Sequence, residues 1–310
     1  MPRKKILSAK PGTGHNVPRR DNILTFTAPE GEGCRLLDFL FASMPEARRT
    51  TVKDYLKYGQ VMLRGQVTTR FDEDVRPGDE VKVNTTRQFQ VFSHPRIKLV
   101  YEDDDIIVID KGYGVLSMGN DKIKEGTAYS ILREYLKRKD PRNKLFIVHR
   151  LDQATSGLMM FAKNVQAKET MQHNWNNMVL ERRYVAVVEG ALEPAEGEIR
   201  SYLAENSAHE VYSTRNPEEG QLAVTYYRTV STRKPYSRVE LSLATGRKNQ
   251  IRVHMKDAGH PIAGDKRYGA KTSPLHRLCL HAQTLRFVHP VSRRDMSFSS
   301  ALPAGFLKIS

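Results

Sequence analysis

Residues 149–163 read His149-Arg-Leu-Asp-Gln-Ala-Thr-Ser-Gly157, followed by Leu-Met-Met-Phe-Ala-Lys163. A short apolar run, Leu145–Val148, precedes this segment, and a second run, Leu158–Phe161, lies within it. Short apolar runs that are bounded by polar turns are typical of buried strands. The sequence therefore predicts two strands joined by a polar turn that carries Arg150 and Asp152. Loops supported by a rigid sheet commonly hold catalytic side chains, so this turn is the first candidate site.

Similar apolar runs recur throughout residues 97–310, with a few helical patterns between them. Strands joined by short hairpins, without regular alternation of strand and helix, indicate an α+β fold with a mixed, largely antiparallel sheet. The expected strands are Ile106–Ile109, Leu145–Val148, Leu158–Phe161, Tyr184–Val188, Val224–Val230, Val239–Leu243 and Leu285–Val288, and the expected helices are Thr127–Arg138, Val165–Val179 and Gln250–Ala258.

A smaller α/β module is expected over residues 33–86, between a basic N-terminal tail at 1–32 and a linker at 87–96. Its first amphipathic helix ends before Pro45, because proline disfavours the helical conformation of the residue before it. A second helix ends at Gly59, a residue suited to the left-handed conformation after a helix. The apolar residues of these helices and of the strands that follow are Leu36, Leu37, Phe39, Leu40, Met44, Val52, Tyr55, Leu56, Val61, Leu63, Val81 and Val83.

The composition is strongly basic: 50 Lys and Arg against 35 Asp and Glu give a formal net charge of +15. Such an excess favours a nucleic-acid partner over a merely basic protein, because each neutralised phosphate releases counterions. The two cysteines, Cys34 and Cys279, are far apart in the sequence, which argues against a disulfide framework and fits a reducing cytoplasm. No apolar run approaches the ~18 residues of a membrane span, so no membrane partner is expected.

No cofactor and no metal are expected. The sequence has no glycine-rich phosphate-binding motif, and the spacing of the histidines between residues 254 and 289 matches no zinc site. These histidines are interpreted as structural or RNA-facing. Trp175 fits the core of a helix better than a cofactor site, and Glu102–Asp105 predicts a solvated turn before a strand.

The segment from His149 to Lys163 resembles the signature of the RluA-type pseudouridine synthases, H-R-L-D-x-x-T-S-G followed by A-K. The resemblance implies that uridine in RNA is converted to pseudouridine without a cofactor, and that Asp152 is the catalytic nucleophile. It also implies that Arg150 fills the gap left when the target nucleotide leaves its stack. Extruding a base is least costly in loops and bulges, so a uridine in a loop or distorted helix is the expected target.

Two strands add to this resemblance. Residues 181–190 resemble the family's K-x-Y-x-A-x-V-x-G strand, whose Tyr stacks on the target base, and this implies the same role for Tyr184. Residues 278–282 resemble L-x-L-H-A, which implies that Leu280 packs in the pocket. Stacking retains a base with roughly 1–3 kcal/mol in single-strand binders, so it would help to keep the detached uracil in place.

Residues 246–254 resemble the family's G-R-x-H-Q-I-R-x-H block. The family's Arg that pairs with the catalytic Asp corresponds to Arg252, and Arg247 is expected to bind the substrate. Asn249 stands where the family has His. The proposed pairing is physically sound, because burial alone would raise the pKa of a carboxyl and leave it protonated. A guanidinium opposes that effect and cannot lose its own charge.

The 33–86 module resembles the S4 RNA-binding domain, with two helices, a G-x-V-x-V-N-G pattern and an x-P-G-D-x-V pattern. Arg49 stands where that domain carries an RNA-facing Arg, and Lys53 lies one helical turn further on. Arg64 replaces the usual Asn of the pattern. The two helices carry no matching acidic stripe, so contact of Arg49 and Lys53 with phosphate is favoured over a merely solvated face.

The favoured interpretation is an RNA isomerase that acts as a monomer in the cytoplasm. The resemblance implies large-subunit ribosomal RNA as its substrate, because family members with an S4-like module before the catalytic domain mostly act on that RNA. Transfer RNA is the alternative substrate. A non-catalytic RNA-binding protein of ribosome assembly would not need Asp152, Tyr184 and Arg252 together, which counts against that interpretation. A hydrolase that releases free uracil would use the same carboxylate, and only the reaction product separates it from an isomerase.

Overall fold

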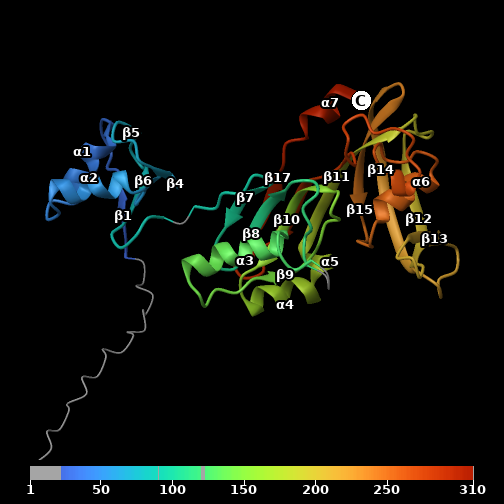
Figure 1. Ribbon diagram of the computed structural model, residues 1–310, viewed down its shortest axis with the longest axis horizontal. Helices are drawn as coiled ribbons and strands as arrows, with labels where there is room; N and C mark the ends of the chain where they lie inside the picture. Colours follow the sequence, from blue (N-terminus) through green and yellow to red (C-terminus); the bar gives the residue numbers. More distant parts are fainter. Residues whose placement is uncertain (1–21, 90, 120–122, 310) are drawn as a thin grey trace, which may run out of the picture. The chain divides into compact units, whose positions relative to one another are not determined.

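The computed structural model describes residues 22–89, 91–119 and 123–309 of the 310-residue chain. By its internal contacts the chain divides into two compact units, one ending at Val91 and one beginning at Phe92. Each unit has its own hydrophobic core, and the helices and strands of both units are labelled in Figure 1.

The first unit is an antiparallel sheet with the strand order β1-β6-β3-β4, packed with two helices. Alternate residues of β3 and β6 and the apolar stripes of both helices form its core. The elements are β1 (Ile23–Thr27), β2 (Cys34–Arg35), α1 (Leu36–Ser43), α2 (Arg49–Lys57), β3 (Val61–Leu63), β4 (Gln66–Thr68), β5 (Asp74–Val75) and β6 (Glu80–Asn84).

Strand β1 lies in the segment 1–32 that was expected to be a tail. Ile23 pairs with Asn84 and Thr27 with Glu80, so the sheet begins about ten residues before Gly33, where the module was expected to start. The local pattern could not reveal this strand, because four of its five side chains are exposed and its backbone partners lie far along the sequence. Residues 1–21 lie outside the described residues.

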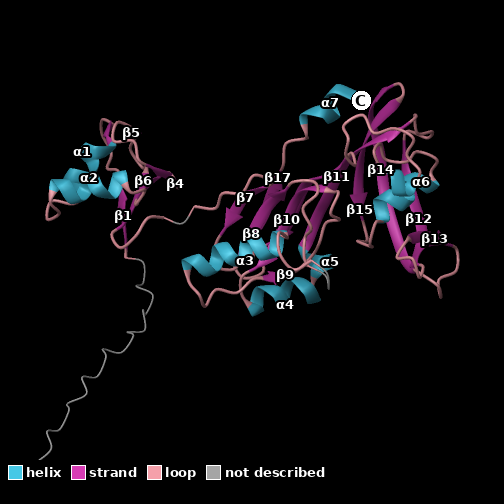
Figure 2. Ribbon diagram, viewed as in Figure 1, coloured by secondary structure: helices cyan, strands magenta, loops and turns pink. Residues whose placement is uncertain are grey.

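The second unit is built on one large sheet with the order β13-β12-β14-β15-β11-β16-β10-β8-β7 (Figure 2). Neighbouring strands are antiparallel except for β10 and β16, which are parallel, so the expected mixed, largely antiparallel sheet is confirmed. Its strands are β7 (Ile97–Glu102), β8 (Ile106–Lys111), β9 (Phe146–Ile147), β10 (Ser156–Ala162), β11 (Val179–Glu189), β12 (Glu196–Glu205), β13 (Val211–Thr214), β14 (Gln221–Arg233), β15 (Tyr236–Leu243), β16 (Leu280–Val288) and β17 (Asp295–Ser299).

Helices cover both faces of this sheet. Along β8, Ile107 and Ile109 join one core cluster with α3, whereas Ile106 and Val108 join the other with α4. The helices are α3 (Ala128–Lys139), α4 (Val165–His173), α5 (Trp175–Met178), α6 (Gln250–Asp257), α7 (Ala304–Ile309) and a 3₁₀ turn at Lys266–Tyr268. None of the described helices has the length and apolar character needed to span a bilayer.

The helix expected over Val165–Val179 is wrong in its extent. It breaks at Asn174, whose backbone leaves the helical region and whose side chain donates to the carbonyl of Thr170. Asn competes with helical hydrogen bonds in this way and has low helix propensity. Val179 instead begins strand β11, which carries the chain directly into the candidate site.

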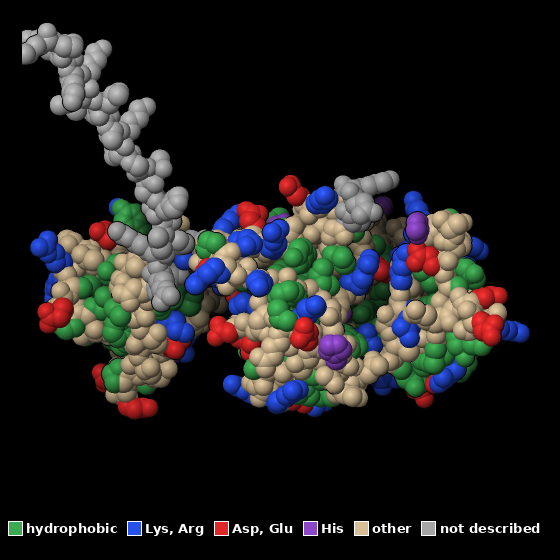
Figure 3. Space-filling model, turned by 90° about the horizontal axis from the view of Figure 1, so that it is seen from below, with side chains coloured by type: hydrophobic (Ala, Val, Ile, Leu, Met, Phe, Trp, Pro, Cys, Tyr) green, Lys and Arg blue, Asp and Glu red, His purple; other side chains and the backbone are tan. Residues whose placement is uncertain are grey.

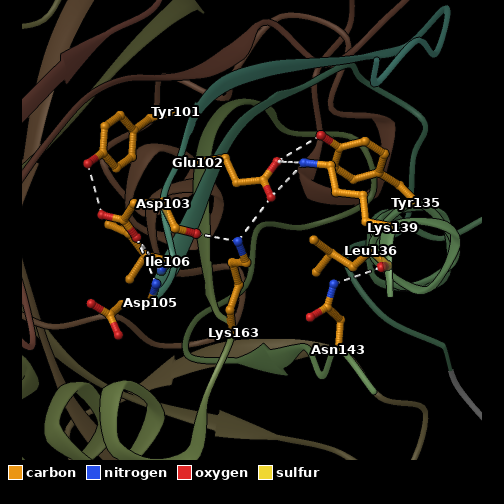
Figure 4. A network of polar contacts seen from close by, with 10 residues as sticks. All are labelled: Tyr101, Glu102, Asp103, Asp105, Ile106, Tyr135, Leu136, Lys139, Asn143 and Lys163. Atoms are coloured by element: carbon orange, nitrogen blue, oxygen red, sulfur yellow. Dashed lines mark hydrogen bonds and ion pairs between the residues drawn. The ribbon is translucent and has the colours of Figure 1, made fainter. Parts of the chain in front are cut away.

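The acidic stretch Glu102–Asp105 is only in part the solvated turn expected from the sequence: Asp104 is exposed, whereas Glu102 ends β7 and is half-buried. The Glu102 carboxylate accepts hydrogen bonds from the Tyr135 hydroxyl at 2.8 Å, the Lys139 ammonium at 2.9 Å and the Lys163 ammonium at 3.0 Å (Figure 4). Lys163 follows β10 and Tyr135 lies on α3, so one carboxylate ties the end of β7 to both. The network fixes the end of β10 opposite to the candidate catalytic turn.

Candidate active site

A pocket lies where the turn before β10, the middle of β11 and the first turn of α6 meet. Six of the eight expected site residues line it together, although they come from four separate parts of the sequence. The remaining two, Arg49 and Lys53, belong to the first unit. The lining residues are Arg150, Leu151, Asp152, Thr155, Tyr184, Leu243, Arg247, Asn249, Gln250, Ile251, Arg252 and Leu280.

Backbone contacts hold the turn that carries Asp152. The Thr155 amide donates to the Asp152 carbonyl at 3.1 Å, which closes the turn. The Ser117 hydroxyl donates to the Leu151 carbonyl at 2.6 Å and accepts from the Leu151 amide at 3.1 Å. The Gly114 amide donates to the Gln153 carbonyl at 2.8 Å. The loop after β8 therefore clamps the turn on both sides of Asp152.

Lys111, at the end of β8, lies buried beneath this turn and was missed by the sequence analysis. Its ammonium donates to the carbonyls of Thr155 at 2.6 Å and Val115 at 2.8 Å. Burial lowers the pKa of Lys111 to about 7, against the opposing charge of Asp152. The available signal was that Asp110 and Lys111 directly follow the apolar run Ile106–Ile109, since buried lysines are rare without a partner.

Arg252 reaches Asp152 from α6, with Nη1 at 3.9 Å from Asp152 Oδ2. Its firmest contacts are with Asp265, which accepts from Nε and Nη2 at 2.7 Å each. Asn249 accepts from Nη1 at 3.1 Å and donates to the Tyr268 hydroxyl at 3.0 Å. The guanidinium is thus held by Asp265 and Asn249 and presents its remaining edge to Asp152. Asp265 was not among the expected site residues.

Opposing influences act on the Asp152 carboxyl. Burial raises its pKa above the ordinary value, while the charges of Arg252, Arg150 and Lys111 lower it, and Asp265 raises it further. The side chain keeps 24 % of its surface exposed, so an incoming group can reach it. The surrounding cations therefore support the ionised form that a nucleophile requires.

The other wall of the pocket is apolar and fits a flat ring. Tyr184 is 9 % exposed and Leu280 is 3 % exposed, and both line the pocket with Leu243 and Ile251. Burial raises the pKa of the Tyr184 hydroxyl, which therefore stays neutral. A carboxylate at one edge and an aromatic face beside it can bind and attack a planar heterocycle attached to a sugar.

Among the described residues, one group has the side-chain types of a metal site: Asp103, Asp105 and His289. Asp103 already accepts from His289 at 2.9 Å, from the Tyr101 hydroxyl at 2.8 Å, and from the backbone amides of Asp105 and Ile106. These bonds account for the arrangement without an ion. None of the three residues lines the pocket around Asp152.

Arg49 and Lys53 lie on α2 of the first unit, and both are exposed. The Arg49 guanidinium is 4.8 Å from the centre of the Phe41 ring, which fixes its position on the surface. Both side chains are accessible to a phosphate.

Comparison with known proteins gives one consistent result. Residues 105–257 match the model of the RNA pseudouridylate synthase family. Uncharacterized RNA pseudouridine synthase YlyB of Bacillus subtilis is 32% identical over 290 residues, which cover 91% of this chain and 95% of that protein. Ribosomal large subunit pseudouridine synthase D of Escherichia coli strain K12 is 30% identical over 304 residues, which cover 92% of this chain and 93% of that protein.

Solved structures agree with the fold. Human RNA Pseudouridylate Synthase Domain Containing 4 superposes with a TM-score of 0.55 at 23% identity, over 68% of this chain and 90% of that one. Human RNA Pseudouridylate Synthase Domain Containing 1 gives a TM-score of 0.54 at 25% identity, over 69% and 86% of the two chains. These likenesses support the α+β assignment made from the strand pattern.

Proposed function

The chain belongs to the RluA-type family of RNA pseudouridine synthases, and from this premise we propose that it isomerises specific uridines of large-subunit ribosomal RNA, with Asp152 as the nucleophile. The observation that carries the proposal is the pocket in which Asp152, Arg252 and Tyr184 meet. The ribosomal substrate is supported by the similarity to ribosomal large subunit pseudouridine synthase D over 92% of this chain. We place the reaction in the cytoplasm and expect the protein to act as a monomer.

In the proposed reaction, ionised Asp152 adds to the ribose or the pyrimidine ring, and the bond between ribose C1′ and uracil N1 breaks. The uracil then rotates and re-bonds to C1′ through C5. The hydrogen at C5 leaves as a proton and N1 gains one, so the product is an isomer of the substrate. Release of Asp152 restores the enzyme, and no cofactor, oxidant or reductant is consumed.

The other pocket residues that were expected from the sequence each have a proposed part. Tyr184 stacks on the uracil and Leu280 packs against it, so that the detached base is retained while it rotates. Arg150, exposed beside the nucleophile, fills the gap left by the extruded nucleotide. Arg247 lines the mouth of the pocket and binds the RNA backbone. Arg252 keeps Asp152 ionised and is itself held by Asp265.

The first unit is proposed to dock the RNA as an S4-like module, leaving the chemistry to residues 97–310. Exposed Arg49 and Lys53 on α2 would contact phosphates. The support for this role is the resemblance of its sequence, the accessible cations and the separate core that lets the unit act as a module of its own.

The function is tested by release of tritium from RNA labelled at uridine C5, with no metal or nucleotide added. Moving the glycosidic bond to C5 must expel that hydrogen, so release into water reports the isomerisation. We expect release from large-subunit ribosomal RNA and none from transfer RNA. Release from transfer RNA alone would overturn the proposed substrate. Free uracil in the products would instead identify a hydrolase, and tight binding with no release from any RNA would identify a non-catalytic protein.

Arg252→Gln is expected to lower kcat by on the order of 10²-fold at neutral pH and to move the acid limb of the pH–rate profile to higher pH. Burial already raises the pKa of Asp152, and Arg252 is the strongest of the charges that lower it. Without the guanidinium, a larger fraction of Asp152 is protonated at any given pH, and only the ionised form attacks. Single-turnover tritium release across the acid and neutral range measures the shift.

Lys256→Gln is the matched control, because it removes a positive charge from the exposed side of the same helix. Its acid limb should coincide with that of the wild type. An unmoved limb in Arg252→Gln, with thermal unfolding similar to the wild type, would show that Arg252 does not set the ionisation of Asp152.

A further inference from the structure

A second and larger cavity, of about 420 Å³, adjoins the candidate uridine pocket. The two share Arg150, Tyr184, Leu243 and Arg247 as lining residues, so they lie side by side. In the space-filling view from below, the second unit is hollowed between its two halves, and Lys and Arg side chains stand around the hollow (Figure 3). The far wall of the cavity comes from the segment between β9 and β10, from α4 and α5, and from the start of β11, and it includes His149, Gln172, Trp175, Asn176 and Arg182.

Arg182 is a half-buried cation that has no carboxylate partner among the described residues. Its Nη2 donates weakly to the Leu243 carbonyl at 3.4 Å, and its guanidinium lies 5.7 Å from the centre of the Trp175 ring. Arg252 in the neighbouring pocket, by contrast, is neutralised by Asp265. Partial burial of an unpaired guanidinium carries a desolvation cost that an anion would offset. The cavity therefore suits a phosphate at Arg182.

Aromatic and donor groups stand beside this cation. The rings of Trp175 and His149 are 5.0 Å apart, and both residues line the cavity. His149 Nε2 accepts from the Met160 amide at 3.0 Å, so the proton of the neutral ring is on Nδ1. Burial lowers the pKa of His149 to about 3, with Arg182 contributing, and the neutral form is therefore kept at working pH. An indole face, a ring N–H and a guanidinium are the groups that bind a nucleotide.

A third hollow, which shares Arg247 with the uridine pocket, is less suited to RNA. It is also lined by Lys248 and by the acidic residues Glu205, Glu218 and Glu219. Carboxylates repel phosphates, whereas the cavity at Arg182 is lined by cations and has no Asp or Glu among its lining residues. A strand that leaves the uridine pocket is thus directed towards Trp175 and Arg182.

We propose that this cavity is a second nucleotide site, in which an unpaired nucleotide next to the target uridine stacks its base on Trp175 and places its phosphate at Arg182. The inference rests on the proposed function, because it takes the ligand to be RNA. The site would favour uridines that lie in loops with an unpaired neighbour, and it would contribute to binding rather than to the chemical step.

Trp175 makes the test direct, because the chain contains one tryptophan. A base that stacks on it should quench its fluorescence. We would titrate the Asp152→Asn protein, which cannot turn over, with pentauridylate and with a five-unit sugar–phosphate strand that lacks bases. Pentauridylate is expected to quench the fluorescence to saturation, whereas the strand without bases should bind without quenching. Absence of quenching by pentauridylate up to millimolar concentration would overturn the site.

Arg182→Gln, added to the same protein, should weaken binding of both strands at least fivefold and lower the salt slope by about 0.7, the contribution of one phosphate on a single strand. Gly246→Ala tests the same contact without removing a charge, because an added Cβ would lie 2.5 Å from Arg182 Nη1 and displace the guanidinium. Arg183→Gln is the control: the adjacent residue of β11 pairs with Glu181 and Glu240 instead. Equal affinities in all three variants would also overturn the proposal.

Measurements of kcat and KM for tritium release distinguish failure of the second nucleotide site from failure of the proposed function on which it rests. With ribosomal RNA, Arg182→Gln in the otherwise wild-type protein should raise KM at least fivefold and leave kcat within twofold. Normal tritium release with an unchanged KM would reject the second site and keep the function. Quenching by pentauridylate without tritium release from any RNA would keep the site and reject the function.

Discussion

Replacing Asp152 with asparagine is expected to abolish tritium release from uridine C5, with a fall in kcat of on the order of 10⁴-fold or more. Asparagine has nearly the same shape, but its amide oxygen cannot form and release a covalent bond to the substrate as a carboxylate does. Binding of ribosomal RNA should stay within about twofold, because the stacking surface of Tyr184 and the surrounding cations are unchanged. Single-turnover release and equilibrium binding, measured on the same RNA, check both parts.

The same substitution should not weaken the fold. Burial raises the pKa of Asp152, which means that the folded protein disfavours the charged carboxyl, and a neutral amide removes that cost. Arg252 remains paired with Asp265, and the ammonium of buried Lys111 keeps its hydrogen bonds to the carbonyls of Thr155 and Val115. The melting temperature should therefore equal or exceed that of the wild type. Asp104→Asn, which removes a charge from an exposed turn, is the control and should release tritium normally. Release by Asp152→Asn within tenfold of the wild type would exclude Asp152 as the nucleophile.

The sequence predicted the elements whose signal is local. The apolar runs located β8, β10, β11 and β16, and the helical spacing of apolar residues located α6. An element that is buried on one face has apolar residues at regular intervals in the sequence. The sequence also identified the six pocket residues as members of one site, because they lie in long motifs that resemble those of a single family. The likeness to known families, rather than residue spacing, linked segments that are a hundred residues apart.

What the sequence could not predict depends on contacts between distant segments. Asp265 gives no sign that it holds Arg252, and Glu102 gives none that it joins Lys139 and Lys163. Trp175 and the Met residues near it were expected to fit a helix core. Trp175 does pack against a core cluster, yet it also borders a cavity formed with residues about seventy positions later. Polar partners and cavities carry no periodic signal, so a single sequence leaves them undetermined.

Gly157→Ala is expected to disrupt the catalytic unit, since Gly157 lies where β10 has begun to pair in parallel with β16. An added Cβ would lie 2.2 Å from the Ala282 carbonyl oxygen and 2.6 Å from its amide nitrogen, and φ is +115°. Because these atoms belong to the backbone of a paired strand, the two strands must separate to make room. We expect the free energy of unfolding to fall by more than about 4 kcal/mol, which corresponds to a melting temperature lower by roughly 10 °C.

Gly126→Ala distinguishes the collision from backbone strain alone, because Gly126 also has a positive φ, +70°, but an added Cβ there would meet no atom within 4 Å. In Gly126→Ala the free energy of unfolding should fall by only about 1–2 kcal/mol, because alanine is strained in the left-handed conformation. Thermal unfolding of both variants measures the difference, and equal shifts would mean that β16 moves aside easily. Such movement would still displace Leu280, because Leu280 is the first residue of β16 and lines the pocket. Tritium release should therefore fall in Gly157→Ala even where the protein remains folded, since the parallel contact between β10 and β16 sets the distance between Asp152 and the wall that holds the base.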